Sequence, residues 1–300
     1  MRIDFLLRKG NESLLENHPY IYRLWVWDKQ KNKYFNMARL IYQLRHQKYD
    51  HVINVHRFAT SGLLAVLSGA KEISGFVKNP FSVFFTHCFA HPFGDGTHEI
   101  ERNQQLISYL TDSVPALPRL YPQEKHYQQA AAFQQSPYVC IAPASVWFTK
   151  QFPVSKWIEL IDKIPDYFHI LLIGGKQDWD LCENICRNVK RKNIENVAGK
   201  LNLLASAALM QGAVMNYVND SAPMHLASAV NAPVCAVFCS TVPEFGYGPL
   251  SDKKFVIQTT EELPCRPCGV HGRRSCPQKH FRCANSIQVE KIIAQTLTEG

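Results

Sequence analysis

The chain has 300 residues, of which 46% are hydrophobic, so a packed globular core is expected and general disorder is not. Its 33 Lys and Arg residues outnumber its 25 Asp and Glu residues, which favours anionic partners without choosing among phosphates, sugar acids, nucleic acid and acidic lipids. Charges interrupt the first apolar run, and no run of about 18 apolar residues follows anywhere. These features argue against a secretion signal and a membrane-spanning helix, and they favour a cytoplasmic location.

The first part of the chain predicts an incomplete α/β domain. Strands are expected at residues 3–7, 23–26 and 51–55, and helices near 36–47 and 99–110. An open parallel sheet usually begins with an apolar strand that runs into a ligand-facing loop, whereas this chain starts at what resembles the second strand of such a domain. Residues 1–130 are therefore assigned to an N-terminal Rossmann-like domain that is incomplete at its start.

From Tyr138 onward, apolar runs alternate regularly with helical patterns, which is typical of βαβ units and a parallel sheet. Strands are expected at residues 138–142, 169–173, 213–219 and 234–238, and helices from Pro153, at 178–190 and at 223–230. The proline-rich and glutamine-rich stretch 111–135 is the expected linker, since such residues end helices and bury little. Residues 135–300 form a second doubly wound domain with a cysteine-rich tail and a terminal helix at 286–297.

One motif joins the end of a predicted strand directly to a predicted helix: Asn219-Asp220-Ser221-Ala222-Pro223-Met224-His225-Leu226-Ala227. Free backbone N–H groups at the start of this helix suit a pyrophosphate, and the Asp220 carboxylate can accept hydrogen bonds from sugar or ribose hydroxyls. Ser221 and His225 are four residues apart, so both can face one ligand. Taken alone, the motif is equally compatible with a plain helix cap at Ser221 and a core histidine at His225.

This motif is continued by Pro233 and by Ser240-Thr241-Val242-Pro243-Glu244-Phe245-Gly246-Tyr247-Gly248-Pro249. Together these segments resemble the donor-site signature of the ADP-heptose:lipopolysaccharide heptosyltransferases, glycosyltransferase family 9. The agreement extends to residues 141–145, Lys150, Trp157 and 174–175, and to 3–6, 17–21 and 98–102, so it covers nearly the whole chain. The resemblance implies a GT-B fold, in which two doubly wound Rossmann-like domains face a central cleft and a C-terminal helix packs back.

The resemblance also implies a donor site in the second domain, formed by Ala144, Ser145, Lys150, Asp178, Leu201, Asp220, Ser221, Ala222 and His225. Lys150 is the cation expected on the donor diphosphate, Asp178 lies near the nucleotide, and Leu201 packs on the base. Family members usually have Gly at the position of Ala222, so a methyl group here lies close to the path of the pyrophosphate. Considered singly, Lys150 and Asp178 are better explained as solvated surface charges, and only their spacing within the pattern favours the donor site.

The implied reaction is an inverting displacement that moves heptose, or a similar sugar, from ADP-heptose to the lipopolysaccharide inner core. Lys150 and the helix start at Ser221 are expected to stabilise the negative charge that develops on the departing diphosphate, without a metal or other cofactor. The family's general base is an Asp in a Gly-Asp motif that precedes the segment matching residues 3–7, and no position of this sequence matches it. A truncated or misassigned start is the favoured explanation, and a protein that binds nucleotide-sugar without turnover is the alternative.

Acceptor contacts are expected in the first domain, where Arg57 follows a strand and His98 and Arg102 lie at the start of a helix. Arginine suits the carboxylates and phosphates of lipopolysaccharide core or another anionic glycan, although ordinary surface charge explains these residues equally well. The aromatic residues between 81 and 89 are expected in the core rather than against lipid. Any membrane contact is expected to be peripheral, on the cytoplasmic face of the inner membrane.

Four of the ten cysteines gather as Cys265-x2-Cys268-x7-Cys276-x6-Cys283. This density is that of a metal knuckle. The resemblance to the family, whose members have similar cysteine-rich tails, implies a structural zinc or a pair of disulfides that braces the loop and takes no part in catalysis. A nucleic-acid-binding zinc knuckle is a third possibility, but no RNA-binding motif with interleaved aromatic residues accompanies it, so no nucleic-acid partner is expected. The remaining cysteines lie in apolar patterns and are interpreted as reduced core residues: Cys88, Cys140, Cys182, Cys186, Cys235 and Cys239.

Overall fold

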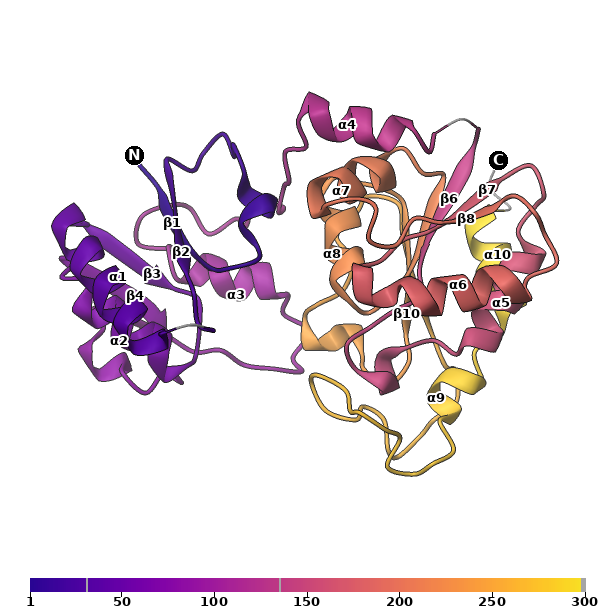
Figure 1. Cartoon of the computed structure of the whole chain (residues 1–300). Helices are drawn as coiled ribbons and strands as arrows, with labels where there is room; N and C mark the ends of the chain where they lie inside the picture. Colours follow the sequence, from indigo (N-terminus) through magenta and orange to yellow (C-terminus); the bar gives the residue numbers. More distant parts are fainter. Residues whose placement is uncertain (31, 135, 298–300) are drawn as a thin grey trace. The chain divides into compact units, whose positions relative to one another are not determined.

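The computed structural model describes residues 1–30, 32–134 and 136–297, and it divides into two compact units, Met1–Leu117 and Pro118 onward (Figure 1). The division lies earlier in the chain than the boundary near residue 130 that the sequence suggested. The reason is that α4 (Glu124–Ala131) packs against α7 (Leu203–Gln211), with Tyr127 Oη donating to Gln211 Oε1 at 2.8 Å. Much of the expected linker is therefore part of the second unit.

The second unit is built on a six-stranded parallel sheet with the order β11-β10-β9-β6-β7-β8. In chain order the strands are β6 (Tyr138–Ala142), β7 (His169–Leu172), β8 (Ile194–Asn196), β9 (Met215–Asn219), β10 (Val234–Phe238) and β11 (Lys254–Gln258). β6, β9 and β10 are buried along their whole length, as expected for central strands of a parallel sheet that is covered on both faces. Every strand predicted for this unit is present, and β8 and β11 are additional.

Helices cover both faces of this sheet (Figure 1). Val139 and Ile141 of β6 pack in one core cluster, with residues of α5 (Val154–Lys163), α6 (Trp179–Asn188) and α10 (Val289–Leu297). Their neighbours Cys140 and Ala142 pack in the other cluster, with residues of α4, α7 and α8 (Ala222–Ala229). This alternation is the period of two that a strand imposes on its side chains.

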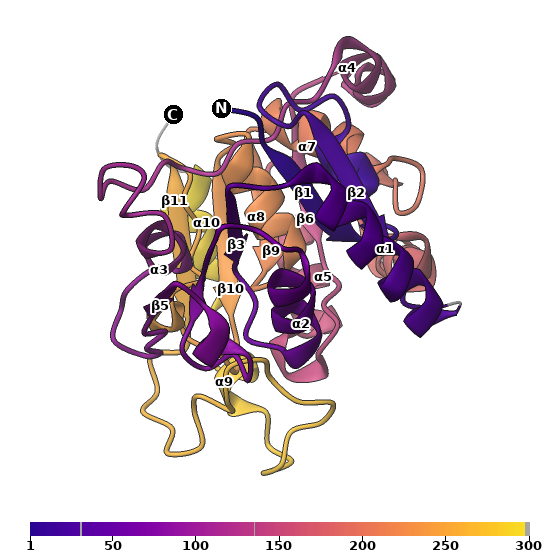
Figure 2. The ribbon, with the colours of Figure 1, turned by 90° about the vertical axis from the view of Figure 1, so that its left-hand side faces the viewer.

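The C-terminal segment differs from the single helix predicted at 286–297. A short helix, α9 (Arg282–Asn285), comes first, and α10 begins at Val289. α10 packs against α5 and lies beside β11, as Figure 2 shows, and Thr296 Oγ1 is 2.7 Å from the Tyr217 hydroxyl of β9. The terminal helix is thus anchored in the core of the second unit.

The first unit contains two separate parallel sheets, where the sequence suggested one. One sheet pairs β1 (Asp4–Arg8) with β2 (Arg23–Trp27), and the other has the order β3-β4-β5, with strands at His51–Asn54, Glu72–Phe76 and His87–Phe89. The helices of this unit are α1 (Lys33–Gln47), α2 (Ala59–Leu67) and α3 (Glu99–Gln105). Apolar side chains of β1 and β2 stay partly uncovered, with Phe5 44% and Val26 42% exposed, so this sheet is less well buried than that of the second unit.

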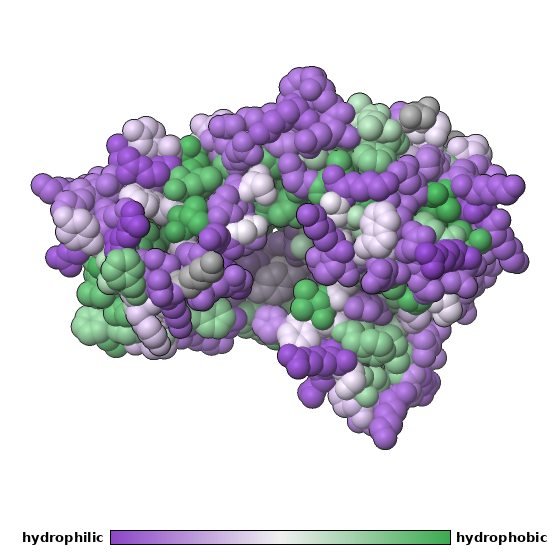
Figure 3. Space-filling view, in the orientation of Figure 1, coloured by the Kyte–Doolittle hydropathy of each residue, from purple (hydrophilic) through white to green (hydrophobic). Residues whose placement is uncertain are grey.

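Two surface features correct or extend the sequence interpretation. Cys88, predicted to be a core residue, is exposed, because it lies on the edge strand β5 with its side chain toward solvent, whereas Cys140, Cys182, Cys235 and Cys239 are buried as predicted. Hydrophilic residues dominate the face seen in Figure 3, with apolar residues in separate patches. Among the described residues, no helix has both the length and the hydropathy needed to cross a bilayer.

Candidate functional site

The strand order of the second unit creates a topological switch between β6 and β9. From β6 the chain continues to β7 and β8 on one side, and from β9 it continues to β10 and β11 on the other side. The loops that follow two such neighbouring strands run apart, and ligands of open parallel sheets bind in the crevice that this leaves outside the carboxyl ends. The loop from Pro143 to Phe152 after β6 and the turn at Asp220 after β9 therefore define the candidate site.

An ion pair joins these two segments at the switch. Lys150 Nζ lies 2.7 Å from Asp220 Oδ2, and the two side chains are 15% and 8% exposed. The same carboxylate oxygen accepts a hydrogen bond of 2.6 Å from Thr241 Oγ1, which follows β10. A carboxylate so far removed from water needs such partners, because desolvating an unpaired charge costs several kcal/mol. Lys150 and the turn at Asp220, which were both expected in one donor site, are therefore in direct contact.

Asn219, at the end of β9, holds the loop that carries Lys150. Its side chain is fully buried. Its Oδ1 accepts a hydrogen bond from Phe152 N at 2.9 Å, and its Nδ2 donates to Pro143 O at 2.8 Å. Both ends of the loop are thereby tied to β9, and Gln151 Nε2 closes the loop further by donating to Ser145 O at 2.6 Å. The predicted residues Ala144 and Ser145 lie within this braced loop.

Helix α8 begins at the switch with little capping from its own side chains. Ser221, the N-cap residue, has an extended backbone and makes no side-chain capping hydrogen bond, and Pro223 lies in the first turn. Ala222 is the first helical residue, and His225, one turn later, is exposed rather than in the core. The plain-cap and core-histidine interpretations are thus wrong. A helix start of this kind offers backbone N–H groups and partial positive charge to an anion.

Asp178 and Leu201 continue the site along the same edge of the sheet, after β7 and β8. Asp178 Oδ2 accepts a hydrogen bond from Gly175 N at 2.8 Å, and a Cβ on Gly174 would lie 2.9 Å from Asp178 Cβ, so this tight turn requires glycine. Leu201 is half-buried and packs against the cluster of α7 and α8. The predicted donor residues therefore follow the carboxyl edge of β9, β6, β7 and β8 in sheet order.

Arg266 is a supporting residue that the sequence analysis missed. Its Nε donates to Cys239 O at 2.8 Å and its Nη2 donates to Thr241 O at 2.8 Å, so it fixes the turn that presents Thr241 to Asp220. Burial lowers the pKa of this guanidinium from its usual value. No local pattern identified it, because its role depends on carbonyl groups more than twenty residues away in the chain.

The candidate acceptor residues of the first unit have different surroundings. Arg102 is fully buried, and it donates to Glu99 Oε2 at 2.8 Å and to Thr97 O at 2.6 Å, so it braces a loop and is not available to a glycan. His98 caps α3, with its Nδ1 accepting from Ile100 N at 3.3 Å. Arg57 lies over a ring, with Cζ 4.6 Å from the centroid of Phe93, and is half-buried. Of these three residues, Arg102 is withdrawn from solvent, whereas Arg57 and His98 are half-buried.

The clustered cysteines line one cavity of the second unit, with a volume of about 250 Å³. Across residues 1–30, 32–134 and 136–297, no three His, Cys, Asp or Glu side chains are arranged as a preformed metal site. All four cysteines are free thiols, so the structure forms neither the predicted zinc site nor the alternative pair of disulfides.

The chain is similar to known glycosyltransferases. The family model described as glycosyltransferase family 9 (heptosyltransferase) matches residues 37–276. Lipopolysaccharide heptosyltransferase 3 of Escherichia coli K12 is 28% identical over 260 residues, which cover 80% of this chain and 74% of that protein.

Two solved structures share the fold. Glycosyl transferase family 9 from Veillonella parvula superposes with a TM-score of 0.81 at 21% identity, covering 98% of this chain and 86% of that one. The Escherichia coli ADP-heptose lipopolysaccharide heptosyltransferase II superposes with a TM-score of 0.75 at 19% identity, covering 97% of this chain and 90% of that one. The predicted α/β fold of the GT-B type is confirmed by these likenesses.

Replacement of Asn219 tests the bracing of the Lys150 loop. Asn219→Ala leaves the Phe152 N–H and the Pro143 carbonyl without their buried partner, so we expect a loss of about 2–4 kcal/mol in the free energy of unfolding measured with urea. Asn188→Ala, which changes an exposed helical asparagine, is the matched control and should change stability by less than about 0.5 kcal/mol. Equal effects of the two substitutions would contradict the bracing role.

Proposed function

We propose that this chain, which belongs to glycosyltransferase family 9, transfers heptose or a similar sugar from ADP-heptose to the inner core of lipopolysaccharide. Its family membership makes it a glycosyltransferase, as the sequence predicted, and the related heptosyltransferases support a role in lipopolysaccharide core biosynthesis. One observation supports the donor part of the proposal above all others: Lys150 and Asp220 meet at the switch point, beside the start of α8. ADP-heptose is the donor named for one protein of the same fold.

The donor diphosphate is proposed to lie against the start of α8, within reach of Lys150. An ammonium group has three N–H donors, so Lys150 can keep its contact with Asp220 while it donates to a phosphate oxygen. Asp220, held by Thr241, then retains a free lone pair for a sugar or ribose hydroxyl. The nucleoside follows the carboxyl edge of the sheet toward Asp178 and Leu201.

In the proposed reaction an acceptor hydroxyl attacks the anomeric carbon while the bond from that carbon to the diphosphate breaks, with inversion. Negative charge grows on the departing diphosphate, where Lys150 and the N–H groups of α8 stabilise it. Preorganised donors of this kind contribute about 3 kcal/mol each in well-studied enzymes. The acceptor proton passes to a general base that we assign to no residue of this sequence, and the scheme uses no cofactor.

The acceptor is proposed to be an anionic glycan bound by the first unit, with Arg57 as one contact.

This unit also carries an exposed apolar patch, formed by Phe58, Val77, Val83 and Phe84, which are between 51% and 81% exposed. Asn79 joins the two loops that carry the patch, because its Nδ2 donates to Phe58 O at 3.1 Å and its Oδ1 accepts from Phe81 N at 2.9 Å. Burial was expected for the aromatic segment, and it holds for Phe85 but not for Phe84.

We further propose that this apolar patch rests on the cytoplasmic face of the inner membrane. Exposed aromatic and branched apolar side chains beside a lysine, here Lys78, are the composition that binds a bilayer interface. Such a contact is peripheral and would bring the chain to a lipid-linked acceptor.

Donor binding is tested at Lys150. Lys150→Met should weaken ADP binding measured by calorimetry by about 10- to 100-fold, which corresponds to roughly 1.4–2.7 kcal/mol. Because that change leaves Asp220 buried without its cation, the double variant Lys150→Met/Asp220→Asn is measured as well and should be similarly weak. Lys156→Met, at a partly exposed lysine paired with Glu159, serves as the control and should bind like the parent chain. Unchanged ADP affinity in both Lys150 variants, or binding of UDP but not ADP, would refute this donor site.

Membrane contact is tested by removing apolar surface from the patch. Val83→Ser/Phe84→Ser should lower co-sedimentation with anionic phospholipid vesicles at least about fivefold, since each buried apolar side chain contributes about 1.5–3 kcal/mol. Val114→Ser, at another exposed valine of the first unit, is the matched control. If the double variant sediments with vesicles as well as the control does, the patch is not the membrane contact.

A further inference from the structure

One long loop of the second unit contacts the turn that carries Lys150. Residues 259–281, all of which the structure describes, contain neither helix nor strand, and three of the clustered cysteines lie among them, so we call this segment the cysteine loop. Loops of this length without secondary structure are usually either functional or disordered. The cysteine loop is fastened to the second unit at several points, and these contacts indicate what it does.

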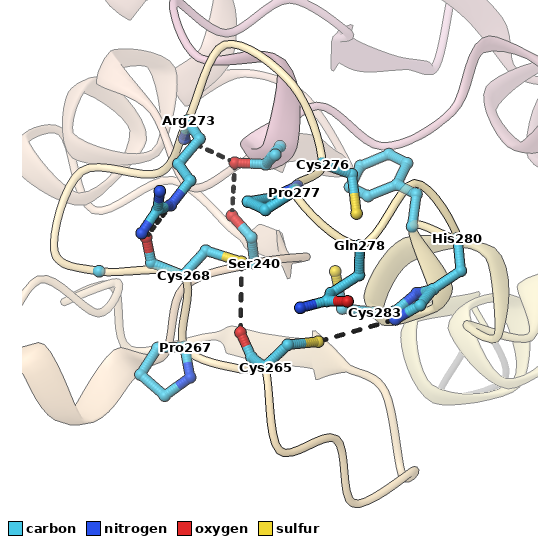
Figure 4. Close-up of a pocket in the computed structure, with 13 residues that line it drawn as sticks. Ser240, Cys265, Pro267, Cys268, Arg273, Cys276, Pro277, Gln278, His280 and Cys283 are labelled. Atoms are coloured by element: carbon cyan, nitrogen blue, oxygen red, sulfur yellow. Dashed lines mark hydrogen bonds between the residues drawn. The ribbon is translucent and has the colours of Figure 1, made fainter.

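Thr149, the residue before Lys150, is the main point of attachment. Its N–H donates to Arg273 O at 3.1 Å, and its Oγ1 accepts from Arg273 N at 2.8 Å. Ser240 Oγ donates to the same hydroxyl oxygen at 2.9 Å, and dashed lines mark the two bonds to this oxygen beside Arg273 and Ser240 in Figure 4. Thr149 is only 1% exposed, so water does not compete for these partners. The backbone beside Lys150 is thereby fixed to the cysteine loop.

Gly272 adds a steric contact with the side chain of Lys150 itself. Its φ is +76°, and a Cβ built on it would lie 2.9 Å from Lys150 Cγ and 3.3 Å from Lys150 Cδ. Only a residue without a side chain lets the backbone come so close to a neighbouring group. The backbone of Gly272 therefore packs directly against the lysine stem and limits the directions in which that stem can extend.

The cysteine loop also reaches the carboxylate that pairs with Lys150. Arg266 Nη2 donates to Thr241 O at 2.8 Å, and Thr241 Oγ1 donates to Asp220 Oδ2 at 2.6 Å. The loop thus contacts Lys150 directly and Asp220 through one intervening residue. Both members of the ion pair depend on the same segment for their surroundings.

We propose that the cysteine loop positions the ammonium group of Lys150, with Thr149, Gly272 and Arg273 as the positioning residues. This inference rests on the donor-binding role proposed for Lys150. The three residues act through the lysine and are not proposed to touch the donor. A lysine stem is long and flexible, so its charge is directed only if neighbouring groups restrict it. Contacts at the backbone and at the stem supply that restriction and leave the ammonium group beside Asp220.

Substitution of Gly272 tests the contact with the lysine stem. Lys150 is 15% exposed and ion-paired, so an amine-acylating reagent should modify it slowly in the full parent chain. In Gly272→Ala the new methyl group must displace the stem, and we expect acylation of Lys150, measured by peptide mass spectrometry, to accelerate at least about threefold. Lys156, a partly exposed lysine paired with Glu159, is the internal reference in each sample.

Gly269→Ala is the matched control for this substitution. It also places alanine at a positive φ, +95°, but a Cβ on Gly269 would have no neighbour within 4 Å. The backbone cost of the two substitutions is therefore similar, whereas only Gly272→Ala collides with the lysine. Equal acylation of Lys150 in the two alanine variants would overturn the steric contact.

Thr149 supplies a second test that does not require alanine at a positive φ. Thr149→Val removes the hydroxyl but keeps the shape, so it should accelerate acylation of Lys150 and weaken ADP binding measured by calorimetry about 3- to 10-fold. Thr149→Ser keeps the oxygen that accepts from Arg273 and Ser240, and it should return both quantities to those of the parent chain. Similar acylation of Lys150 in the valine and serine variants would overturn the role of Thr149.

The two kinds of measurement separate this inference from the proposed function. Acylation needs no ligand, so it tests the positioning of Lys150 even if the parent chain does not bind ADP. Absence of ADP binding by the parent chain would refute the proposed donor site and leave the loop contacts unaffected. If the parent chain binds ADP and both Gly272→Ala and Thr149→Val bind it equally well, the cysteine loop does not position the lysine for the donor.

Discussion

The end of β9 is the point on which the candidate site depends. Asn219 is buried there and ties both ends of the Lys150 loop, and Asp220 follows it and pairs with Lys150 at 2.7 Å. Both contacts exist because β9 lies beside β6 in the sheet although more than seventy residues separate them in the chain. The sheet order thus brings a cation, a carboxylate and a helix start together through contacts within the protein itself.

The second unit was predictable because β6 and β10 are continuous apolar runs and β9 is mostly apolar, which is typical of strands in a sheet covered on both faces. The first unit was less predictable. Its strands are short and its apolar residues are partly exposed, so no sequence pattern required two sheets in place of one. The exposure of Cys88 could not be predicted from the sequence either, because its position on an edge strand decides it and the local sequence does not.

At the candidate site, the sequence suggested the residues to which the proposal gives chemical roles, but it did not show which contacts brace them. Lys150, Asp220 and Ser221 belong to recognisable motifs, whereas the contacts of Thr149, Thr241 and Arg266 depend on loops brought together by the fold. Arg102 was expected to contact the acceptor because an arginine in a charged segment suggests a ligand contact. In the structure its side chain is fully buried and donates to carbonyl groups of its own loop. The roles of such residues are set by tertiary contacts that local patterns do not contain.

Lys150 is held from two sides, and this has a consequence for electrostatic stabilisation. A lysine side chain is long and flexible, and fixing it costs up to about 2 kcal/mol of side-chain entropy. Asn219 braces the loop from the sheet, while the cysteine loop contacts Thr149 and the lysine stem from the opposite side. Much of that side-chain entropy is therefore lost when the protein folds, so the proposed binding of a donor need not supply it. A cation fixed beforehand stabilises developing charge without reorganising, which is the arrangement that favours a transition state over a ground state.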